Sequence, residues 1–202
     1  MTLNKFESIK PFMGGNRFTV FWVVLLLSFG SLFSCKDEVI PKPKSFLYLE
    51  YPIASYHQFK NDCPYSFAIS KESRINFEPG CKATIFYPKL DATVFITYRR
   101  VHNNLKQILS EADKLTTKHT IKADAIVPYP YENKERKVYG VLFEVQGQSA
   151  SNVQFHVTDS SKHVLTAALY FDVRPNYDSI YPAVDYIKND MMKMMETLEW
   201  QE

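Results

Sequence analysis

The residues whose types and spacing most clearly predict chemistry are Leu32, Phe33, Ser34 and Cys35. They end an uncharged apolar run that begins near Phe18, and several basic residues precede that run. A basic segment, a short apolar segment and a small residue before cysteine are typical of a bacterial lipoprotein signal. In this interpretation the signal is removed, the Cys35 sulfur carries diacylglycerol, and the new amino group of Cys35 carries an acyl chain.

The apolar run is short for a permanent membrane span. As a helix at about 1.5 Å per residue, residues 18–33 would cover roughly 24 Å, less than the ~30 Å hydrocarbon core of a bilayer. An uncleaved single-pass anchor and an ordinary cleaved signal remain alternatives, and Met13 is a second candidate start. The sequence therefore predicts a signal peptide over 1–34, a lipidated cysteine and short tether over 35–45, and a single globular domain over 46–202.

Composition favours a packed domain with no role in nucleic-acid binding. Apolar residues make up 46% of the chain and aromatic residues 15%, which is enough for an aromatic-rich core. The formal net charge of +2 is small, and the basic residues are scattered among acidic ones with no recognisable nucleic-acid motif. We therefore expect no nucleic-acid partner.

Two cysteines remain once Cys35 is assigned to the lipid. Because Cys63 and Cys81 belong to an exported domain, an even remaining count predicts a disulfide between them. Two separate buried thiols are the alternative. No histidine stands at a ligand-like spacing from either cysteine, so we expect no metal site.

Hydrophobic alternation with a period of two predicts most of the domain as strands. The expected strands are residues 46–51, 65–69, 74–77, 83–87, 93–98, 123–129, 138–146, 153–158 and 163–173. In 138–146 the alternation places Tyr139, Val141, Phe143 and Val145 on one face. The candidate strands 65–69 and 74–77 are expected to pair, and the short turns after residue 123 predict antiparallel hairpins.

Two helices complete the pattern. Asn103 or Asn104 can cap the first, whose apolar stripe runs from Leu105 to His119. Asp178 or Ser179 is expected to cap the second, with Pro182 in its first turn. Its buried stripe is predicted to be Val184, Ile187, Met191, Met194 or Met195, and Leu198. A methionine-rich partner surface is the alternative to this core assignment.

These elements predict an α+β fold, an antiparallel sheet of about six to eight strands with two main helices packed on it. The element order resembles the PsbP/Mog1-like sandwich, at the level of fold analogy only.

The sequence contains no motif of a known enzyme class, neither a nucleophile elbow nor a zinc, phosphate or dinucleotide motif. His156 and His163 could meet across their hairpin, and Asp159 and Ser160 lie near His163. A tight solvated turn explains these residues without catalysis. We therefore expect no catalytic residues and no cofactor.

Polar residues at the hairpin ends leave a ligand-binding alternative open. Gln148, Asn152 and Gln154 could bind a glycan, although exposed hairpin ends have the same composition.

A candidate contact with a protein partner precedes the closing helix. It consists of Asn176, Tyr177, Asp178 and Tyr181, between Pro175 and Pro182. Tyrosines on a stiffened backbone provide contact area at low entropic cost and are enriched in interface hot spots. Sealing of the core edge by both rings is the competing explanation.

Several segments resemble one known family across the whole mature chain. They are the run from Cys35 to Lys44, Leu49 to Pro52, Asp62 to Tyr65, Lys118 to Ala125, Gln154 to Ser160 and Pro175 to Ile180. In these segments the chain is similar to the gliding motility lipoprotein GldD family of Bacteroidetes.

The resemblance implies a non-enzymatic lipoprotein required for gliding motility and tied to the type IX secretion machinery. We expect it to be a scaffold or assembly component with other gliding or secretion proteins as partners. The expected location is the cell envelope, anchored by lipid to a membrane, the outer membrane facing the periplasm. An exported lipoprotein that binds a glycan or peptide is the alternative, and a cryptic hydrolase ranks last.

Overall fold

The computed structural model describes residues 22, 50–59, 61–118, 123–172 and 176–201. The chain divides into two units, Met1–Lys44 and Ser45–Glu202. In the first unit only Trp22 is described. None of the helices among the described residues has the length and apolar character needed to cross a bilayer.

The second unit contains a main sheet of seven strands, all antiparallel to their neighbours. In spatial order the strands are β3 (Arg74–Glu78), β4 (Lys82–Tyr87), β5 (Ala92–Arg100), β9 (His163–Phe171), β8 (Val153–Thr158), β7 (Val138–Gly147) and β6 (Ala123–Asn133). A smaller sheet pairs β1 (Tyr56–Phe59), β2 (Tyr65–Ser70) and β10 (Glu199–Trp200). The predicted α+β class with a main antiparallel sheet is confirmed, whereas the PsbP/Mog1 analogy stays a prediction.

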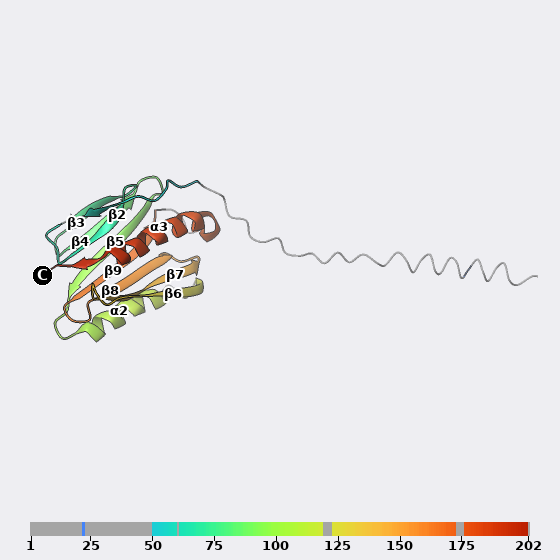
Figure 1. Cartoon of the computed structure of the whole chain (residues 1–202). Coiled ribbons are helices and arrows are strands. Elements are labelled where there is room, and N and C mark those ends of the chain that lie inside the picture. The colour runs from blue at the N-terminus through green and yellow to red at the C-terminus, as the bar shows by residue number, and fades with distance from the viewer. Residues whose placement is uncertain (1–21, 23–49, 60, 119–122, 173–175, 202) are drawn as a thin grey trace, which may run out of the picture. The chain divides into compact units, whose positions relative to one another are not determined.

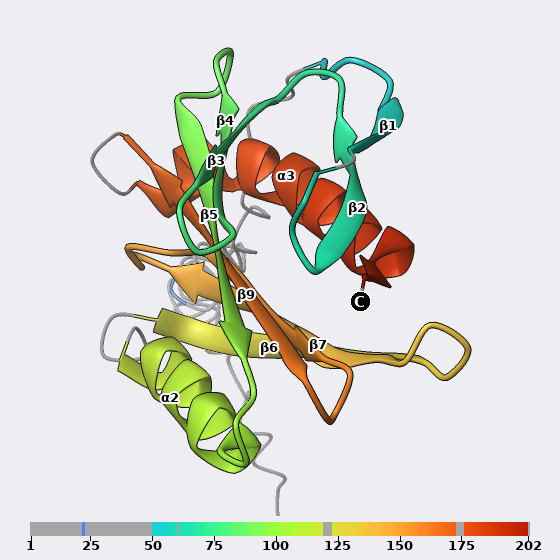
Figure 2. The same cartoon turned by 90° about the vertical axis from the view of Figure 1, so that its left-hand side faces the viewer.

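Two helices lie on opposite faces of the main sheet (Figures 1 and 2). The first, α2 (Leu105–Lys118), packs on β8 and β9, and the second, α3 (Tyr177–Thr197), packs against β2, β7 and β8. The core lies between the main sheet, α3 and the smaller sheet. Its largest fully buried side chains include Tyr65, Phe67, Tyr87, Leu165 and Met191. The predicted stripe of α3 is confirmed, because Val184, Ile187, Met191, Met194, Met195 and Leu198 are all buried.

The start of the domain departs from the sequence prediction. Of the expected strand 46–51, residues 46–49 lie outside the described part, and Glu50 and Tyr51 are not in a strand. The first described strand is β1, which was not predicted because its four residues, Tyr-His-Gln-Phe, do not alternate between apolar and polar. The expected pairing of 65–69 with 74–77 is wrong, since β2 pairs with β1 and β10 while β3 pairs with β4.

Strand β6 continues through Pro128 and Pro130 to Asn133, beyond the predicted end of this strand at residue 129. Proline cannot donate a backbone hydrogen bond and is tolerated mainly on edge strands. Since β6 is the last strand of the main sheet and pairs only with β7, the missing donors disrupt no second ladder. The prolines thus mark an edge and do not end the strand.

The ends of the last two elements also differ from expectation. Helix α3 begins at Tyr177 with Asn176 as its N-cap residue, earlier than predicted, and Pro182 lies beyond the first turn. The Asn176 carbonyl accepts hydrogen bonds from the backbone of Ser179 and Ile180, and no side chain caps this end. Strand β9 ends at Phe171, and residue 173 of its predicted range lies outside the described part. The chain does not end on the helix, because β10 follows and pairs with β2.

Candidate functional site

One face of the main sheet carries three exposed aromatic side chains, Phe86, Phe95 and Tyr170. We call these rings, together with the concavity between them and α2, the open aromatic face. These three side chains belong to β4, β5 and β9 and are 39%, 49% and 37% exposed. Their strands pair in register: Phe86 is opposite Thr93, and Thr93 is opposite Tyr170. The rings of Phe95 and Tyr170 meet edge to face at 5.7 Å between centroids. Three large rings thus share one side of neighbouring strands.

This face stays open because only one helix lies on it. Helix α2 packs on β8 and β9 and also reaches the end of β5, where Arg99 is 2.6 Å from Glu111. This leaves β3 and β4 without a covering element on this face among the described residues. A concavity of about 430 Å³ lies between the rings and the helix. Its lining includes Phe95, Thr97, Ala112, Gln154, His156 and Tyr170. Lysine, arginine, aspartate and glutamate are absent from the described residues that line it.

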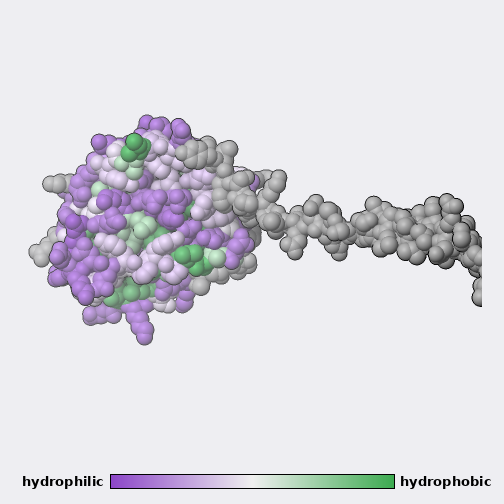
Figure 3. All heavy atoms as spheres, turned by 45° about the vertical axis from the view of Figure 1, so that its right-hand side comes forward, coloured by the Kyte–Doolittle hydropathy of each residue, from purple (hydrophilic) through white to green (hydrophobic). Residues whose placement is uncertain are grey.

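Sequence reasoning did not identify this face. The alternation separated Thr93, Phe95 and Thr97 from Val94, Ile96 and Tyr98, but it does not reveal which side remains uncovered. The available signal was an aromatic residue between two threonines on the less apolar side of the strand. Grouped exposed apolar side chains mark interaction sites more often than scattered ones. The side of the described surface that Figure 3 draws is mainly hydrophilic, with only small, separate hydrophobic patches.

The predicted contact before α3 is divided by the structure into exposed and shielded parts. Asn176 and Asp178 are exposed, whereas Tyr177 and Tyr181 are half-buried. The Tyr177 hydroxyl oxygen is shielded from solvent and lies near Glu144. Burial raises the pKa of Tyr177, and its ring meets that of Tyr181 at 5.5 Å. The position of Tyr177 supports the sealing role, and docking by this segment stays a prediction.

The two histidines of the predicted pair do not meet. His156 lies opposite Thr166, so it shares a sheet face with the even-numbered residues of β9, whereas His163 projects from the other face. His156 is 3.8 Å from the Asp113 carboxylate of α2, and burial lowers its pKa. His163 is hydrogen bonded to the Tyr98 hydroxyl at 2.8 Å and is stacked on Trp200.

Asp159 organises its turn through the backbone. One carboxylate oxygen accepts hydrogen bonds from the N–H groups of Ser161, Lys162 and His163 at 2.8 to 2.9 Å. Burial alone would raise the pKa of Asp159, but these donors hold it below its usual range. The Ser160 N–H donates to the Thr158 hydroxyl. The turn interpretation accounts for all of these contacts without a nucleophile.

The polar residues considered for glycan binding are not displayed together. Asn152 is buried, and its side-chain amide donates to the carbonyls of Val145 and Gly147 at 2.8 and 3.2 Å. Gly147 has a positive φ of 97°, a conformation that favours glycine. Gln148 is exposed, whereas Gln154 is buried at the open aromatic face. Asn152 therefore stabilises its hairpin end.

A buried ion pair connects β7 to α3. The Lys188 ammonium group is 2.9 Å from Glu144 and 2.8 Å from Asp185. Glu144 is 2% exposed and also accepts a hydrogen bond from the Tyr129 hydroxyl at 3.0 Å. Burial opposes the charged form of Lys188, but the hydrogen bonds to Asp185 and Glu144 raise its pKa overall. Sequence reasoning missed this pair because its members are 44 residues apart.

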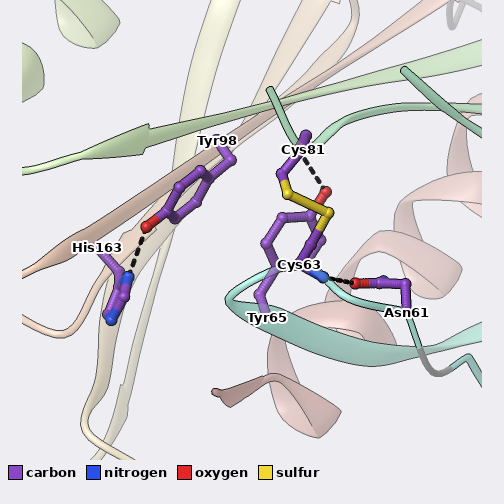
Figure 4. Close-up of a disulfide and its surroundings, with 6 residues drawn as sticks. All are labelled: Asn61, Cys63, Tyr65, Cys81, Tyr98 and His163. Atoms are coloured by element: carbon purple, nitrogen blue, oxygen red, sulfur yellow. Dashed lines mark hydrogen bonds between the residues drawn. A yellow bond between two sulfur atoms is a disulfide. The ribbon is translucent and has the colours of Figure 1, made fainter. Parts of the chain in front are cut away.

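The two candidate disulfide cysteines are bonded to each other in the structure, with Cα atoms 5.5 Å apart (Figure 4). Cys63 precedes β2 of the smaller sheet, and Cys81 lies in the turn between β3 and β4 of the main sheet. The Tyr65 hydroxyl donates to the Cys81 carbonyl at 2.8 Å. Since β2 and β3 do not pair, the bond joins the two sheets.

Replacing Cys63 and Cys81 together by alanine is expected to lower the free energy of unfolding by about 3 kcal/mol, because the bond restricts a short loop in the unfolded chain. Urea denaturation of oxidised wild type and the double variant measures the difference. Reduced wild type should resemble the variant. Equal stability of all three samples would contradict the prediction, as would labelling of both thiols in denatured, non-reduced protein.

The predicted lipidation site Cys35 lies outside the described residues. Among the described residues, no group of three or more histidine, cysteine, aspartate or glutamate side chains is arranged to hold a metal ion.

Comparison with protein families matches residues 36–200 to the family of the gliding motility lipoprotein GldD. No curated protein matches the chain. The match begins directly after Cys35 and continues into β10, so it covers the helices and strands described above. The chain belongs to the gliding motility lipoprotein GldD family.

Proposed function

We propose that this protein is a non-enzymatic assembly component of the gliding and type IX secretion machinery. Lipid on Cys35 would hold it on the outer membrane, facing the periplasm. The open aromatic face would bind another protein of that machinery. Membership of the gliding motility lipoprotein family supports a role in gliding. The proposal that this face docks a partner rests on the exposed rings of Phe95 and Tyr170.

The chemistry of the face indicates the kind of segment that it binds. The described lining offers aromatic rings, small side chains, threonine hydroxyls, the Gln154 amide and the His156 imidazole, with no lysine, arginine, aspartate or glutamate. An apolar segment of a partner would cover the rings without desolvating a charge, which is costly when the charge stays unpaired. Large rings also provide much contact area with few rotatable bonds, as interface hot spots do.

Replacing Phe95 and Tyr170 together by glutamine is expected to abolish spreading of cells while leaving the protein folded and anchored. Both rings are partly exposed, so their loss should cost little stability compared with a core substitution. Colony spreading measures function, and cross-linking in intact cells followed by affinity purification measures partner retention. Thermal unfolding of the purified variant checks the fold.

Ile53→Gln provides the matched control, because Ile53 is 95% exposed and lies outside the open aromatic face. This variant should spread normally. A Phe95 and Tyr170 variant that spreads and retains its partners would overturn the docking role. Direct binding of an envelope glycan or a short peptide by the purified protein, abolished in the same variant, would favour the alternative function as a ligand-binding lipoprotein.

A further inference from the structure

The dimensions of the main sheet beside α2 match those of one helix. Helix α2 packs on β8 and β9, and the next strands in the sheet are β5 and β4. Neighbouring strands are about 4.8 Å apart, so a helix lying over β5 and β4 would be about 10 Å from the axis of α2. Packed helices have their axes 8–10 Å apart. A second helix could therefore lie on this face in contact with α2.

The three rings of the open aromatic face belong to the strands at this position. The register places Phe86 of β4 and Tyr170 of β9 in one row across the sheet, on either side of Thr93. Phe95 of β5 belongs to the next row on the same face. Beyond β4, the exposed side chain of Arg74 lies opposite Phe86. The apolar centre thus has a polar rim on β3, which is the pattern that an amphipathic helix requires.

A groove follows α2 along the sheet. The concavity of about 430 Å³ at the rings shares Thr97, Ala112 and Thr166 with a further concavity of about 390 Å³. The second concavity is also lined by Arg99 and Glu111, whose ion pair joins β5 to α2. Ala112 is the residue of α2 that lines both concavities, and its small side chain permits another backbone to approach. Side chains on the flank of a second helix would fill this groove.

The backbone of the sheet indicates which kind of segment can cover this face. Strand β4 is paired with β3 and β5, and β5 is paired with β4 and β9, so their backbones have no ladder to offer to a segment laid across them. An extended segment on the face would bury N–H and C=O groups without partners, which is costly. A helix pairs these groups within itself. An added strand would have to use the edge of β3, away from the groove.

We propose that the open aromatic face binds one amphipathic helix of a partner protein, which lies beside α2 and over β4 and β5. This inference rests on the proposed docking role of the same face. Strand β4 has six residues and is about 20 Å long, so a helix of about 13 residues would span it. Apolar side chains at every third or fourth position of that helix would contact the rings, and its polar side chains would face solvent.

Photo-cross-linking in intact cells tests the proposal with the full lipidated protein. The probe p-benzoylphenylalanine, an aromatic residue like those it replaces, is placed singly at Phe86, Phe95 and Tyr170. We expect all three positions to label a single segment of one partner. Mass spectrometry should locate the labelled residues three, four or seven positions apart, as on one face of a helix.

Other labelling patterns would overturn the proposed helix. Labels two residues apart would indicate an extended strand, labels on several segments would indicate a flat surface, and labels on this same chain would indicate a second copy. Each of these results leaves protein docking at this face in place. Absence of adducts at all three positions would overturn the docking role as well. Probe placed at Ile53, which is exposed outside this face, is the control and should not label the segment.

Ala112→Trp tests the position of the helix beside α2. The larger side chain would fill the groove, so the yield of the adduct from the probe at Phe95 should fall by at least about tenfold. Lys106→Trp is the matched control, because Lys106 is exposed on the same helix and lies outside both concavities. An undiminished yield in folded Ala112→Trp would overturn the placement beside α2. Should Ala112→Trp fail to fold, the spacing of the labels in the protein with alanine at this position still decides the question.

Discussion

Cells that carry Cys35→Ser are expected to lose gliding, and the protein is expected to lose its lipid. The thiol of Cys35 is the atom that would carry diacylglycerol, and a serine hydroxyl does not substitute for it in this interpretation. Several acyl chains hold a protein on a bilayer stably, whereas one chain does so only marginally. Without the anchor, the domain would no longer be concentrated at the membrane beside its partners.

Mass spectrometry of the amino terminus, cell fractionation and colony spreading measure the effect of Cys35→Ser. Wild type should begin at a triacylated Cys35, while the variant should carry no lipid. For the lipid measurement by mass spectrometry, the double variant of Cys63 and Cys81 is the matched control, because it removes two cysteines and leaves the predicted lipidation site intact. Recovery of wild type with an unmodified Cys35, or with residues 1–34 still attached, would contradict the prediction.

The strands and helices that sequence reasoning located share a local signal. Strand β5 alternates Val94 and Ile96, both buried, with the exposed Phe95, and α3 repeats its buried residues with a helical period. These patterns arise within a few neighbouring residues, so they can be read without knowledge of the remaining chain.

Features that depend on contacts between residues far apart in the chain were not predicted. Strand β10 has only two residues and exists because Glu199 and Trp200 pair with Ser66 and Tyr65 of β2. The open aromatic face is likewise a property of where α2 lies on the sheet. Neither feature leaves a periodic pattern, because the contact that creates it joins residues far apart in the chain.

The predicted meeting of His156 and His163 also failed because it depends on how two strands pair. Hairpin spacing suggested that His156 and His163 could meet, but the register places His156 opposite Thr166. A shift of one residue moves a side chain to the other face of a sheet. Chemistry inferred from sequence proximity in a hairpin therefore requires the register, which the turn residues did not fix.

Replacing Lys188 by methionine is expected to destabilise the domain by about 3 to 5 kcal/mol, because it leaves the Glu144 carboxylate buried without its cation. Glu144 is 2% exposed, and the tyrosine hydroxyls of Tyr129 and Tyr177 are neutral donors that cannot replace the lost cation. The free energy of unfolding of a typical domain is only about 5 to 15 kcal/mol. This single substitution would therefore remove a large part of the stability of the domain.

Glu144→Gln should cost less than Lys188→Met, because Lys188 keeps the Asp185 carboxylate at 2.8 Å and glutamine can still accept from Tyr129. The double variant with Glu144→Gln and Lys188→Met should recover part of the loss, since neither buried charge then remains. Urea denaturation of the three variants completes a double-mutant cycle. Lys193→Met is the matched control: its ion pair with Glu196 on the same helix is well exposed, so the expected change is below about 1 kcal/mol. If Lys188→Met proved no more harmful than Lys193→Met, the buried pair would not hold β7 to α3, and the packing of Met191 and its apolar neighbours would have to supply that attachment alone.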